Sequence, residues 1–480
     1  MNVFETLSQA ASQWPERPAV IDGAGQLDYR SLWREIQALR IQLDRQGVRD
    51  GQGVGVLARN GRAFIIGALA ALGCNAVVMP LDYQLKANEL AELLARVPLS
   101  ALLDAGSGPP PGGGLRSELG LLDGTPLRLT QLRGAAPAPL VPWVEGAAFV
   151  RFTSGTTGAA KGVILTHQGV LERSRAANAG LGLTGQDKVL WVLPMAYHFF
   201  VSVLLYLEVG AAILVSAGDL AESVLEAAAR HQATFLYGAP MHVRLLAADL
   251  SGRRLPPTLK RVLSVSSRLH PQVARDFFSR YGLPVTQGYG VIEVGLPILN
   301  LLDAAEHPEA IGRPLPAYEA AILDEAGQPV AEGETGQLAL RGPGMFAGYL
   351  HPPRRREEVL RRGWFMTGDL AHRDGAGLIT IDGRSKSVIN VGGHKVFPEE
   401  VAAVLDQHPA VLRSRVTARP HPQLGEVVHA EVQLRQPGVT VATEAILGFC
   451  RRQLSGFKVP ASLELVSAID LTPSGKVRHG

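Results

Sequence analysis

The stretch FVRFTSGTTGAAKGVILTH (residues 149–167) decides how this chain of 480 residues is interpreted. It contains an apolar strand, a loop of Thr, Ser and Gly that Lys161 closes, and a second apolar segment. Glycines let backbone N–H groups approach phosphate oxygens, hydroxyls add donors, and a lysine neutralises charge. A phosphate-binding loop is therefore indicated, although a Gly/Ser/Thr turn without a ligand has the same composition.

The loop does not match the P-loop of the common NTPases. That pattern needs adjacent Gly and Lys followed by Ser or Thr. Here Ala159 and Ala160 separate Gly158 from Lys161, and Gly162 follows the lysine. A P-loop NTPase is therefore excluded.

Short apolar strands alternate with helical patterns on both sides of this loop. A strand–helix–strand pattern that repeats many times predicts an α/β fold with parallel sheets. The expected strands lie within 53–58, 76–82, 100–105, 147–154, 188–195, 211–217, 234–240 and 261–266. The expected helices between them include 88–97, 221–231 and 271–282.

Two segments before the loop need separate predictions. Residues 63–81 carry no charge and are long enough to suggest a membrane span. Gly73, Cys74 and Asn75 interrupt them and Pro80 follows, so we predict a buried helix at 63–72, a turn and a buried strand at 76–79. Residues 106–138 are rich in Gly, Pro and Leu and are expected to form a loose surface connection.

The pattern changes after about residue 311. Short alternating strands at 318–323, 336–341 and 378–381 predict a small β-rich subdomain within a large N-terminal domain, residues 1–383. Residues 384–480 are expected to form a separate C-terminal α+β domain. Its predicted helices are 398–408 and 443–454, and its predicted strands lie near 413–420, 427–434 and 462–469.

The composition is that of a globular protein without an obvious macromolecular partner. Hydrophobic residues make up 46% and charged residues 19% of the chain. A net charge of +3 gives no indication of a nucleic-acid partner. The two cysteines, Cys74 and Cys450, lack metal-ligand spacing, and the N-terminus lacks the basic start and apolar core of a signal peptide. We expect a cytoplasmic protein without a membrane span.

Residues 149–167 resemble the phosphate-binding signature of the adenylate-forming (ANL, AMP-binding) superfamily, with Ala160 where that family usually has Pro. The superfamily includes acyl-CoA synthetases, firefly-type luciferases and nonribosomal peptide adenylation domains. The resemblance implies a large N-terminal domain with a mobile C-terminal lid. It also implies that ATP phosphates contact Thr153, Ser154, Gly155, Thr156, Thr157, Gly158 and Lys161.

Two further segments resemble the nucleotide site of this family. In QGYGVIEVG (residues 287–295), the likeness implies that Gly288, Tyr289 and Gly290 lie against adenine and that Glu293 holds Mg²⁺. A carboxylate is a suitable hard-oxygen ligand for Mg²⁺ beside phosphates. Ile292 replaces the family's Thr, so one phosphate contact is expected to be missing. In GWFMTGDLA (residues 363–371), the likeness implies that Asp369 accepts the ribose hydroxyls.

The last two segments resemble the hinge and the terminal lysine motif. In DGRSKSVINVGGHKVFPEEV (residues 382–401), the resemblance implies Arg384 at the ribose or phosphate and Lys386 at the pivot. Gly392 and Gly393 would line the route of an incoming thiol. In LTPSGKVRHG (residues 471–480), Lys476 would contact the substrate carboxylate and stabilise the charge that develops at the α-phosphorus.

The resemblance implies a ligase that uses ATP and Mg²⁺. It would activate a carboxylic acid as an acyl-adenylate with release of pyrophosphate, then transfer the acyl group to a thiol. The thiol would belong to coenzyme A (CoA) or to the phosphopantetheine arm of a carrier protein. The alternatives are a non-catalytic nucleotide-binding homologue and an oxidative or lactone-forming relative.

The acid pocket is partly predictable. Phe200 stands where amino-acid-activating relatives have the Asp that pairs with the substrate ammonium, so α-amino acids are excluded. His198 resembles the histidine that gates or orients the carboxyl group, and the less favoured alternative is a core histidine capped by a backbone carbonyl. We expect His198, Phe200 and Gly295 in the pocket. The apolar residues at 203–205 and 294–299 favour a fatty acyl chain over an uncharged aryl acid.

Overall fold

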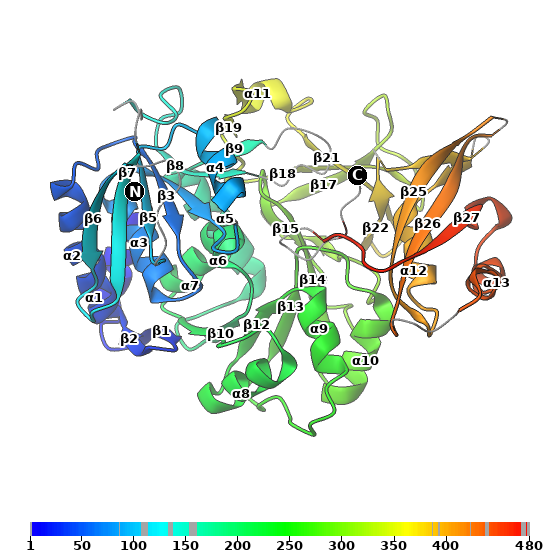
Figure 1. The fold of residues 1–480 in the computed structure, drawn as a ribbon, viewed down its shortest axis with the longest axis horizontal. Helices are drawn as coiled ribbons and strands as arrows, with labels where there is room; N and C mark the ends of the chain where they lie inside the picture. The colour runs from blue at the N-terminus through cyan, green and yellow to red at the C-terminus, as the bar shows by residue number, and fades with distance from the viewer. Residues whose placement is uncertain are drawn as a thin grey trace.

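The computed structural model describes most of the chain (Figure 1). The described residues are 2–85, 87–106, 114–132, 138–152, 161–385, 387–391, 394–422, 424–436, 441–471 and 477. The predicted site residues 153–158, Lys386, Gly392, Gly393 and Lys476 lie outside these ranges. Their roles therefore stay predictions.

One nine-stranded sheet carries the strands on both sides of the predicted phosphate loop. Its order is β20-β19-β9-β8-β4-β3-β5-β7-β6. Parallel strands buried on both faces need nearly continuous apolar runs, and β4, VVMPL, is buried at every position. The strands are β3 (Gly53–Leu57), β4 (Val77–Leu81), β5 (Ala101–Asp104), β6 (Gly114–Gly120), β7 (Pro126–Leu132), β8 (Ala147–Phe152), β9 (Gly162–Thr166), β19 (Gly348–Tyr349) and β20 (Arg354–Arg355).

A second nine-stranded sheet has the order β16-β15-β14-β13-β12-β10-β11-β1-β2. Its strands from β1 through β11, β10, β12 and β13 to β14 run parallel, and β14 turns back into β15 as an antiparallel hairpin. The strands are β1 (Pro18–Asp22), β2 (Gly25–Asp28), β10 (Lys188–Trp191), β11 (Ala212–Val215), β12 (Phe235–Gly238), β13 (Arg261–Ser264), β14 (Val285–Val291), β15 (Gly295–Leu299) and β16 (Arg313–Pro314).

Helices cover both faces of each sheet. They are α1 (Val3–Gln13), α2 (Tyr29–Arg45), α3 (Arg62–Gly73), α4 (Ala87–Arg96), α5 (His167–Leu181), α6 (Met195–His198), a π-helix (Phe199–Val203), α7 (Leu204–Glu208), α8 (Ala221–His231), α9 (Pro240–Ala247) and α10 (Pro271–Tyr281). Short α11 (Arg356–Val359) follows β20. The predicted α/β class and the helix–turn–strand interpretation of residues 63–79 are confirmed.

Strand alternation separates the core into layers. Val78 of β4 packs in the central core, which α1, α2, α3 and α5 share with both sheets. Its neighbour Met79 points to the opposite face and packs with Leu90 of α4. On the second sheet, Leu236 of β12 packs outward with Phe277 of α10. The layers are therefore helix, sheet, helices, sheet and helices.

A small antiparallel sheet follows, in the order β17-β18-β21-β22. Its strands are β17 (Glu319–Leu323), β18 (Gly336–Arg341), β21 (Phe365–Arg373) and β22 (Ile379–Arg384). These strands occupy the region where the sequence predicts a β-rich subdomain.

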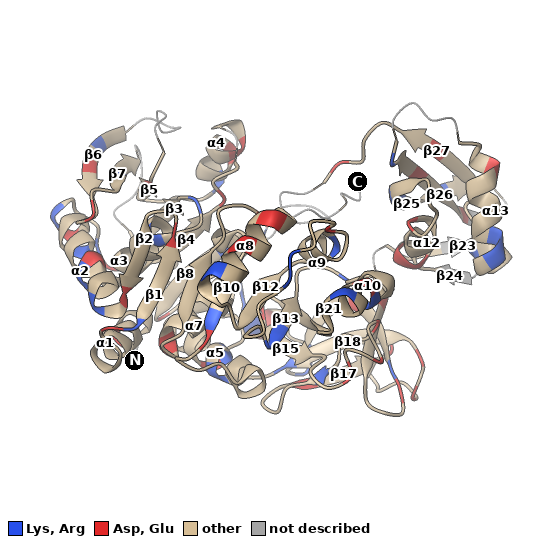
Figure 2. Ribbon diagram, turned by 90° about the horizontal axis from the view of Figure 1, so that it is seen from below, with Lys and Arg blue, Asp and Glu red and all other residues tan. Residues whose placement is uncertain are grey.

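The remaining described residues form a five-stranded sheet with its own core. Its strands are β23 (Ile389–Val391), β24 (His394–Val396), β25 (Val411–His421), β26 (Gly425–Leu434) and β27 (Ser462–Val466), with α12 (Pro398–Leu405), α13 (Thr443–Gln453) and a 3₁₀ turn (Gly456–Lys458). In Figure 2 this unit lies to one side of the rest of the chain, and acidic and basic residues are mixed over most elements. The predicted boundary at residues 383 and 384 stays a prediction.

The prediction of a loose surface connection at residues 106–138 is wrong for its described part. β6 and β7 form a hairpin that extends the first sheet by pairing β7 with β5. Leu127 and Leu129 are each 1% exposed, so the leucines of this segment belong to the core and not to a surface connection. The alternation of apolar and polar residues in PLRLTQL is the strand signal that the Gly- and Pro-rich flanks concealed.

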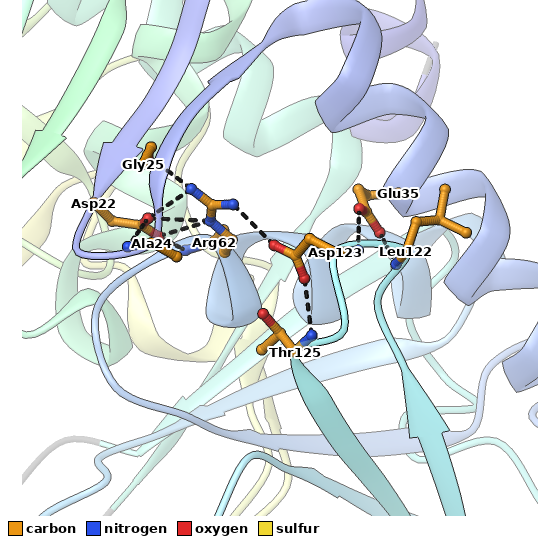
Figure 3. Close-up of polar contacts among 8 residues, drawn as sticks. All are labelled: Asp22, Ala24, Gly25, Glu35, Arg62, Leu122, Asp123 and Thr125. Atoms are coloured by element: carbon orange, nitrogen blue, oxygen red, sulfur yellow. Dashed lines mark hydrogen bonds and ion pairs between the residues drawn. The ribbon is translucent and has the colours of Figure 1, made fainter.

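Buried charges fasten the turn of this hairpin (Figure 3). Arg62, at the start of α3, donates to Asp22 Oδ1 at 2.8 Å and to Asp123 Oδ2 at 2.8 Å. Glu35 Oε2 accepts from the Leu122 amide at 2.7 Å, and its Oε1 accepts from the Asp123 amide at 3.1 Å. Arg62 thus joins the β1–β2 hairpin of one sheet to the β6–β7 turn of the other.

The described helices include none with both the length and the hydropathy to cross a bilayer. α3, the candidate raised by the sequence, spans 12 residues and is buried within the central core.

Candidate functional site

The carboxyl ends of the parallel strands of the second sheet lie at one edge, the position where open α/β sheets bind ligands. β10 ends at Trp191, β12 at Gly238 and β13 at Ser264, and β14 carries Tyr289. The predicted site residues described below are distributed around this edge.

One cluster joins the β14 segment to the small sheet. The Tyr289 hydroxyl donates to Asp369 Oδ2, and Arg384 Nε donates to Asp369 Oδ1 at 3.1 Å. Asp369 and Arg384 face each other because β21 and β22 pair in antiparallel register at these residues. Burial and the Asp369 charge raise the pKa of Tyr289 well above its usual value, so it remains a neutral donor. Three residues predicted for the nucleoside therefore lie in direct contact.

The glycines beside Tyr289 are required by close packing. A Cβ on Gly290 would lie 2.5 Å from the Gly295 carbonyl oxygen across the β14–β15 hairpin. A Cβ on Gly288 would lie 3.0 Å from side-chain atoms of Leu263 and Leu299. Any larger residue would displace the strand that presents Tyr289.

A second cluster surrounds Glu293. Tyr349 on β19 donates its hydroxyl to Glu293 Oε1 at 2.9 Å, and the Lys161 ammonium lies 4.8 Å from the centre of the Tyr349 ring. Burial raises the pKa of Glu293, while the Tyr349 hydrogen bond, Lys161 and Arg151 oppose that rise. The exposed Lys161 therefore lies beside the carboxylate predicted to bind metal.

Arg173 holds the backbone of this cluster in place. It is 2% exposed, donates through Nη1 to the Ile292 carbonyl at 2.8 Å, and donates through Nε to the Gly344 carbonyl at 2.8 Å. The Ile292 side chain packs against the central core. This residue therefore contributes a carbonyl and an apolar contact, and has no hydroxyl to offer a phosphate.

His198 lies at the end of α6, at the same sheet edge. Its Nδ1 is 3.4 Å from the Tyr237 hydroxyl and its Nε2 is 3.4 Å from the Ser266 hydroxyl. Ser266 has a φ of 78°, a strained value for a residue other than glycine that often marks functional positions. The Trp191 ring lies edge-on to His198, at 6.1 Å.

Phe200 and Gly295 lie deeper than predicted for pocket residues. Phe200 is 0% exposed, and its ring centre is 5.3 Å from that of Phe149. A Cβ on Gly295 would meet Arg173 at 3.4 Å and the Tyr318 hydroxyl at 3.3 Å. The residues at 203–205, which favoured a fatty acyl chain, also pack in the central core. A pocket role for these residues stays a prediction.

Arg151 is a partly buried cation between the Glu293 cluster and His198. It donates through Nη1 to the Tyr197 carbonyl at 2.7 Å, and its guanidinium carbon is 5.0 Å from the centre of the Tyr197 ring. Burial lowers its pKa to about 10, and the opposing influences include Tyr197, Glu293 and Tyr237. Arg151 therefore remains charged at neutral pH.

Sequence reasoning missed four residues of this site: Arg151, Arg173, Tyr237 and Tyr349. Arg151 carried a usable signal, because a charge within the apolar strand AAFVRF requires a reason. Arg173 is likewise a charge on the buried side of α5. Tyr237 and Tyr349 are ordinary strand residues by pattern, and only their partners distinguish them.

Two family models match the chain. AMP-binding enzyme matches residues 7–350, and the AMP-binding enzyme C-terminal domain matches residues 400–476. The chain is also similar to ATP-bound MatB from Rhodopseudomonas palustris, with a TM-score of 0.84 and 24% identity over 100% of this chain and 97% of that one.

Curated relatives are acid–CoA ligases of different substrate classes. Sulfoacetate–CoA ligase from Cupriavidus necator is 29% identical over 99% of this chain and 97% of its own length. Feruloyl-CoA synthase from Amycolatopsis sp is 30% identical over 98% of each chain. Long-chain-fatty-acid–CoA ligase from Escherichia coli O157:H7 is 32% identical over 70% of this chain and 61% of its own length.

Proposed function

The chain belongs to the AMP-binding enzyme family, and from this premise we propose which acid it activates and how its residues share the work. It is an ATP-dependent acid–thiol ligase that forms an acyl-adenylate, and CoA is its acceptor. The proposed acid is apolar, with a fatty acyl acid as first candidate. A carrier protein's phosphopantetheine arm is the alternative acceptor.

The observation that carries the choice of acid is the aromatic side chain of Phe200. Its ring is fully buried against Phe149, so this position offers no carboxylate to a substrate ammonium. Burying an ammonium without a partner costs several kcal/mol. α-Amino acids are therefore poor substrates in this proposal.

Two exposed or partly exposed apolar residues that follow Tyr237 in the chain support the fatty acyl candidate. Ala239 is partly exposed two residues after Tyr237, and Met241 at the start of α9 is 48% exposed. With its carboxylate at His198, an acyl chain would extend past these residues. Methionine adapts to flexible apolar ligands because it is unbranched and polarizable.

An aryl acid is the second candidate. The similarity to feruloyl-CoA synthase covers nearly the whole chain, whereas the similarity to the fatty-acid ligase covers less of it. The rings of Trp191 and Tyr237, which both lie next to His198, stack with their centres 5.1 Å apart. The ring of an aryl substrate would make a further edge-on or offset contact with these two rings.

For ATP, we assign the nucleoside to Tyr289, Asp369 and Arg384 and the phosphates to Lys161 and the preceding loop. Asp369 is 8% exposed and already accepts two hydrogen bonds. The Tyr289 ring would lie along adenine, between Gly288 and Gly290. Support comes from the direct contact among the three side chains.

Glu293 is suited to hold Mg²⁺. It is a partly buried carboxylate, and burial raises its pKa despite the opposing Tyr349 hydrogen bond, Lys161 and Arg151. Mg²⁺ prefers carboxylate and phosphate oxygens. When bound, the ion would neutralise phosphate charge. The hydrogen bond from Tyr349 would restrict the side-chain rotamer of Glu293.

The chemistry requires positioning more than covalent participation. A carboxylate oxygen forms a bond to the α-phosphorus of ATP, and the bond to pyrophosphate breaks. The CoA sulfur then attacks the acyl carbonyl, and AMP leaves with the oxygen of the mixed anhydride. Lys476 would serve the first step, and rotation about Lys386 would open the path past Gly392 and Gly393 for the second.

The test is an ATP–pyrophosphate exchange screen over fatty, aryl and amino acids, repeated with CoA and with a phosphopantetheinylated carrier. Exchange should rise with C6–C14 acids and stay flat with all twenty amino acids. Strong exchange with an amino acid would refute the assignment of Phe200. A chain that binds ATP but shows no exchange with any acid would favour the non-catalytic alternative.

A further inference from the structure

Arg151 lies on β8 where strand alternation aims it between the two large sheets. Phe149, two residues earlier on the same face, contacts the rings of Phe199 and Phe200. Arg151 continues this face toward the Tyr197 backbone, where its Nη1 makes a 2.7 Å hydrogen bond. The guanidinium therefore lies against the segment that carries His198.

Arg151 makes no ion pair with any residue that the structure describes, and the Glu293 carboxylate acts on its charge only from beyond ion-pair distance. Among the described residues, no carboxylate oxygen lies within ion-pair distance of it, and its Nε is buried without a hydrogen-bond partner. Arg128 and Arg62 differ because each is paired with a carboxylate, Asp104 and Asp22 respectively. Arg173 makes no ion pair within the described part of the chain either, but it donates three hydrogen bonds to backbone carbonyl oxygens. A partly buried guanidinium whose Nε has no partner in the described ranges is incompletely satisfied, and at this position an anionic ligand would complete its hydrogen bonding.

The position of Arg151 narrows the choice of anion. Its electrostatic neighbours are Tyr197, Glu293 and Tyr237. Glu293 is on the proposed phosphate side, and Tyr237 contacts His198, which is on the proposed acid side. The two groups that meet between these sides are the α-phosphate and the substrate carboxylate. Lys161 already lies beside Glu293 on the phosphate side, so the substrate carboxylate, which Lys476 is also predicted to contact, is the anion that Arg151 is placed to meet.

We propose that Arg151 binds the carboxylate of the substrate acid and makes the site selective for the anion over neutral acid derivatives. This inference rests on the proposed function, because it needs an acid site at His198. Nε, which has no partner in the described structure, supplies the first hydrogen bond to the carboxylate. The guanidinium fork suits a planar carboxylate better than a point charge does.

The test compares Arg151→Gln and Arg151→Lys with the parent chain and with Arg128→Gln. Arg128 is a matched control, since it is another buried arginine on β7, distant from the site. Calorimetry with a non-hydrolysable ATP analogue measures binding of octanoate against octanamide and of cinnamate against cinnamamide. Pyrophosphate exchange gives KM for the acid and for ATP.

In Arg151→Gln, affinity for the carboxylate should fall about tenfold to hundredfold, the loss typical of a hydrogen bond to a charged group. Affinity for the amide should change by less than about threefold. KM for ATP should also stay nearly constant, and Arg151→Lys should recover part of the carboxylate affinity. In Arg128→Gln, thermal stability should fall while the preference for the carboxylate persists.

Several results would overturn the inference. Equal losses for carboxylate and amide would mean that Arg151 only holds the Tyr197 segment. A rise confined to KM for ATP would assign Arg151 to the phosphates. If the parent chain binds neither acid in the calorimetry, the proposed acid site itself is refuted. If the parent chain binds an acid and Arg151→Gln binds it equally well, only the role of the arginine is refuted.

Discussion

Replacing Tyr349 by Phe should shift the pH dependence of the ligase through Glu293. The hydroxyl donates to Glu293 Oε1 at 2.9 Å, and this hydrogen bond favours the ionised carboxylate. A hydrogen bond to a charged group contributes about 1.5–3 kcal/mol, and 1.36 kcal/mol corresponds to about one pKa unit. Since burial already raises the pKa of Glu293, Tyr349→Phe should raise it by about one to two further units.

The assay is the pH profile of kcat/KM for ATP in pyrophosphate exchange. If the ionised Glu293 is needed to bind Mg²⁺, the acid limb should move to higher pH by the same one to two units, as estimated above. Activity at alkaline pH should approach that of the parent chain, because Glu293 is ionised there in both proteins.

The free energy of unfolding should also depend on pH through Glu293. A carboxyl group whose folded-state pKa is raised favours folding below its ordinary pKa, which is 4.5, and this contribution is lost as pH rises through the raised value. Tyr349→Phe raises that value further, so its destabilisation relative to the parent should grow as pH rises from the parent's folded-state value to the higher value of the variant, and stay constant above it. Urea unfolding at several pH values measures this difference.

Tyr318→Phe is the matched control. The Tyr318 hydroxyl is buried and has no hydrogen-bond partner among the described residues, so its removal should leave both the acid limb and the stability nearly unchanged. The combined variant Tyr349→Phe and Glu293→Gln should show no further shift beyond Glu293→Gln alone. An acid limb that is identical in Tyr349→Phe and Tyr318→Phe would refute the assignment of that limb to Glu293.

Three further predictions address the nucleoside site, the hairpin and the terminal lysine. Asp369→Asn should raise KM for ATP about tenfold to hundredfold in exchange assays, because the carboxylate proposed to accept the ribose hydroxyls, which Tyr289 and Arg384 hold in place, becomes a neutral amide; an unchanged KM contradicts the ribose assignment. Arg62→Met should lower the free energy of unfolding by about 3–5 kcal/mol in urea titrations, because two carboxylates lose their buried partner, and a loss below about 1 kcal/mol contradicts that account. Lys476→Ala should reduce adenylation far more than thioester formation from preformed adenylate, and equal losses refute its role.

Local patterns predicted most of the secondary structure. The helix at 221–231 and the strand at 336–341 occur with the predicted bounds. These predictions succeed because apolar spacing reports which face of an element is buried, and that information is contained within a few turns or residues. The hairpin at 114–132 was missed because Gly and Pro in its flanks masked a short strand pattern.

The residues expected to bind an acyl chain show a different limit of prediction from sequence. Residues 203–205 and Phe200 are apolar, and their pattern is compatible with a pocket wall or with a core. The structure places them in the central core between the sheets. Hydrophobicity identifies residues that avoid water, but it does not distinguish protein contacts from ligand contacts.

The sequence by itself determined the family resemblance and the α/β class, and it predicted residues for a nucleotide site, because these depend on short motifs with characteristic spacing. Only the tertiary structure decided which side chains meet. Tyr289 reaches Asp369 through a hydrogen bond across 80 positions of the chain, and Arg151 reaches the Tyr197 carbonyl across 46. Such pairings depend on strand order and sheet packing. The unpartnered Nε of Arg151 therefore became apparent only when its described surroundings were known.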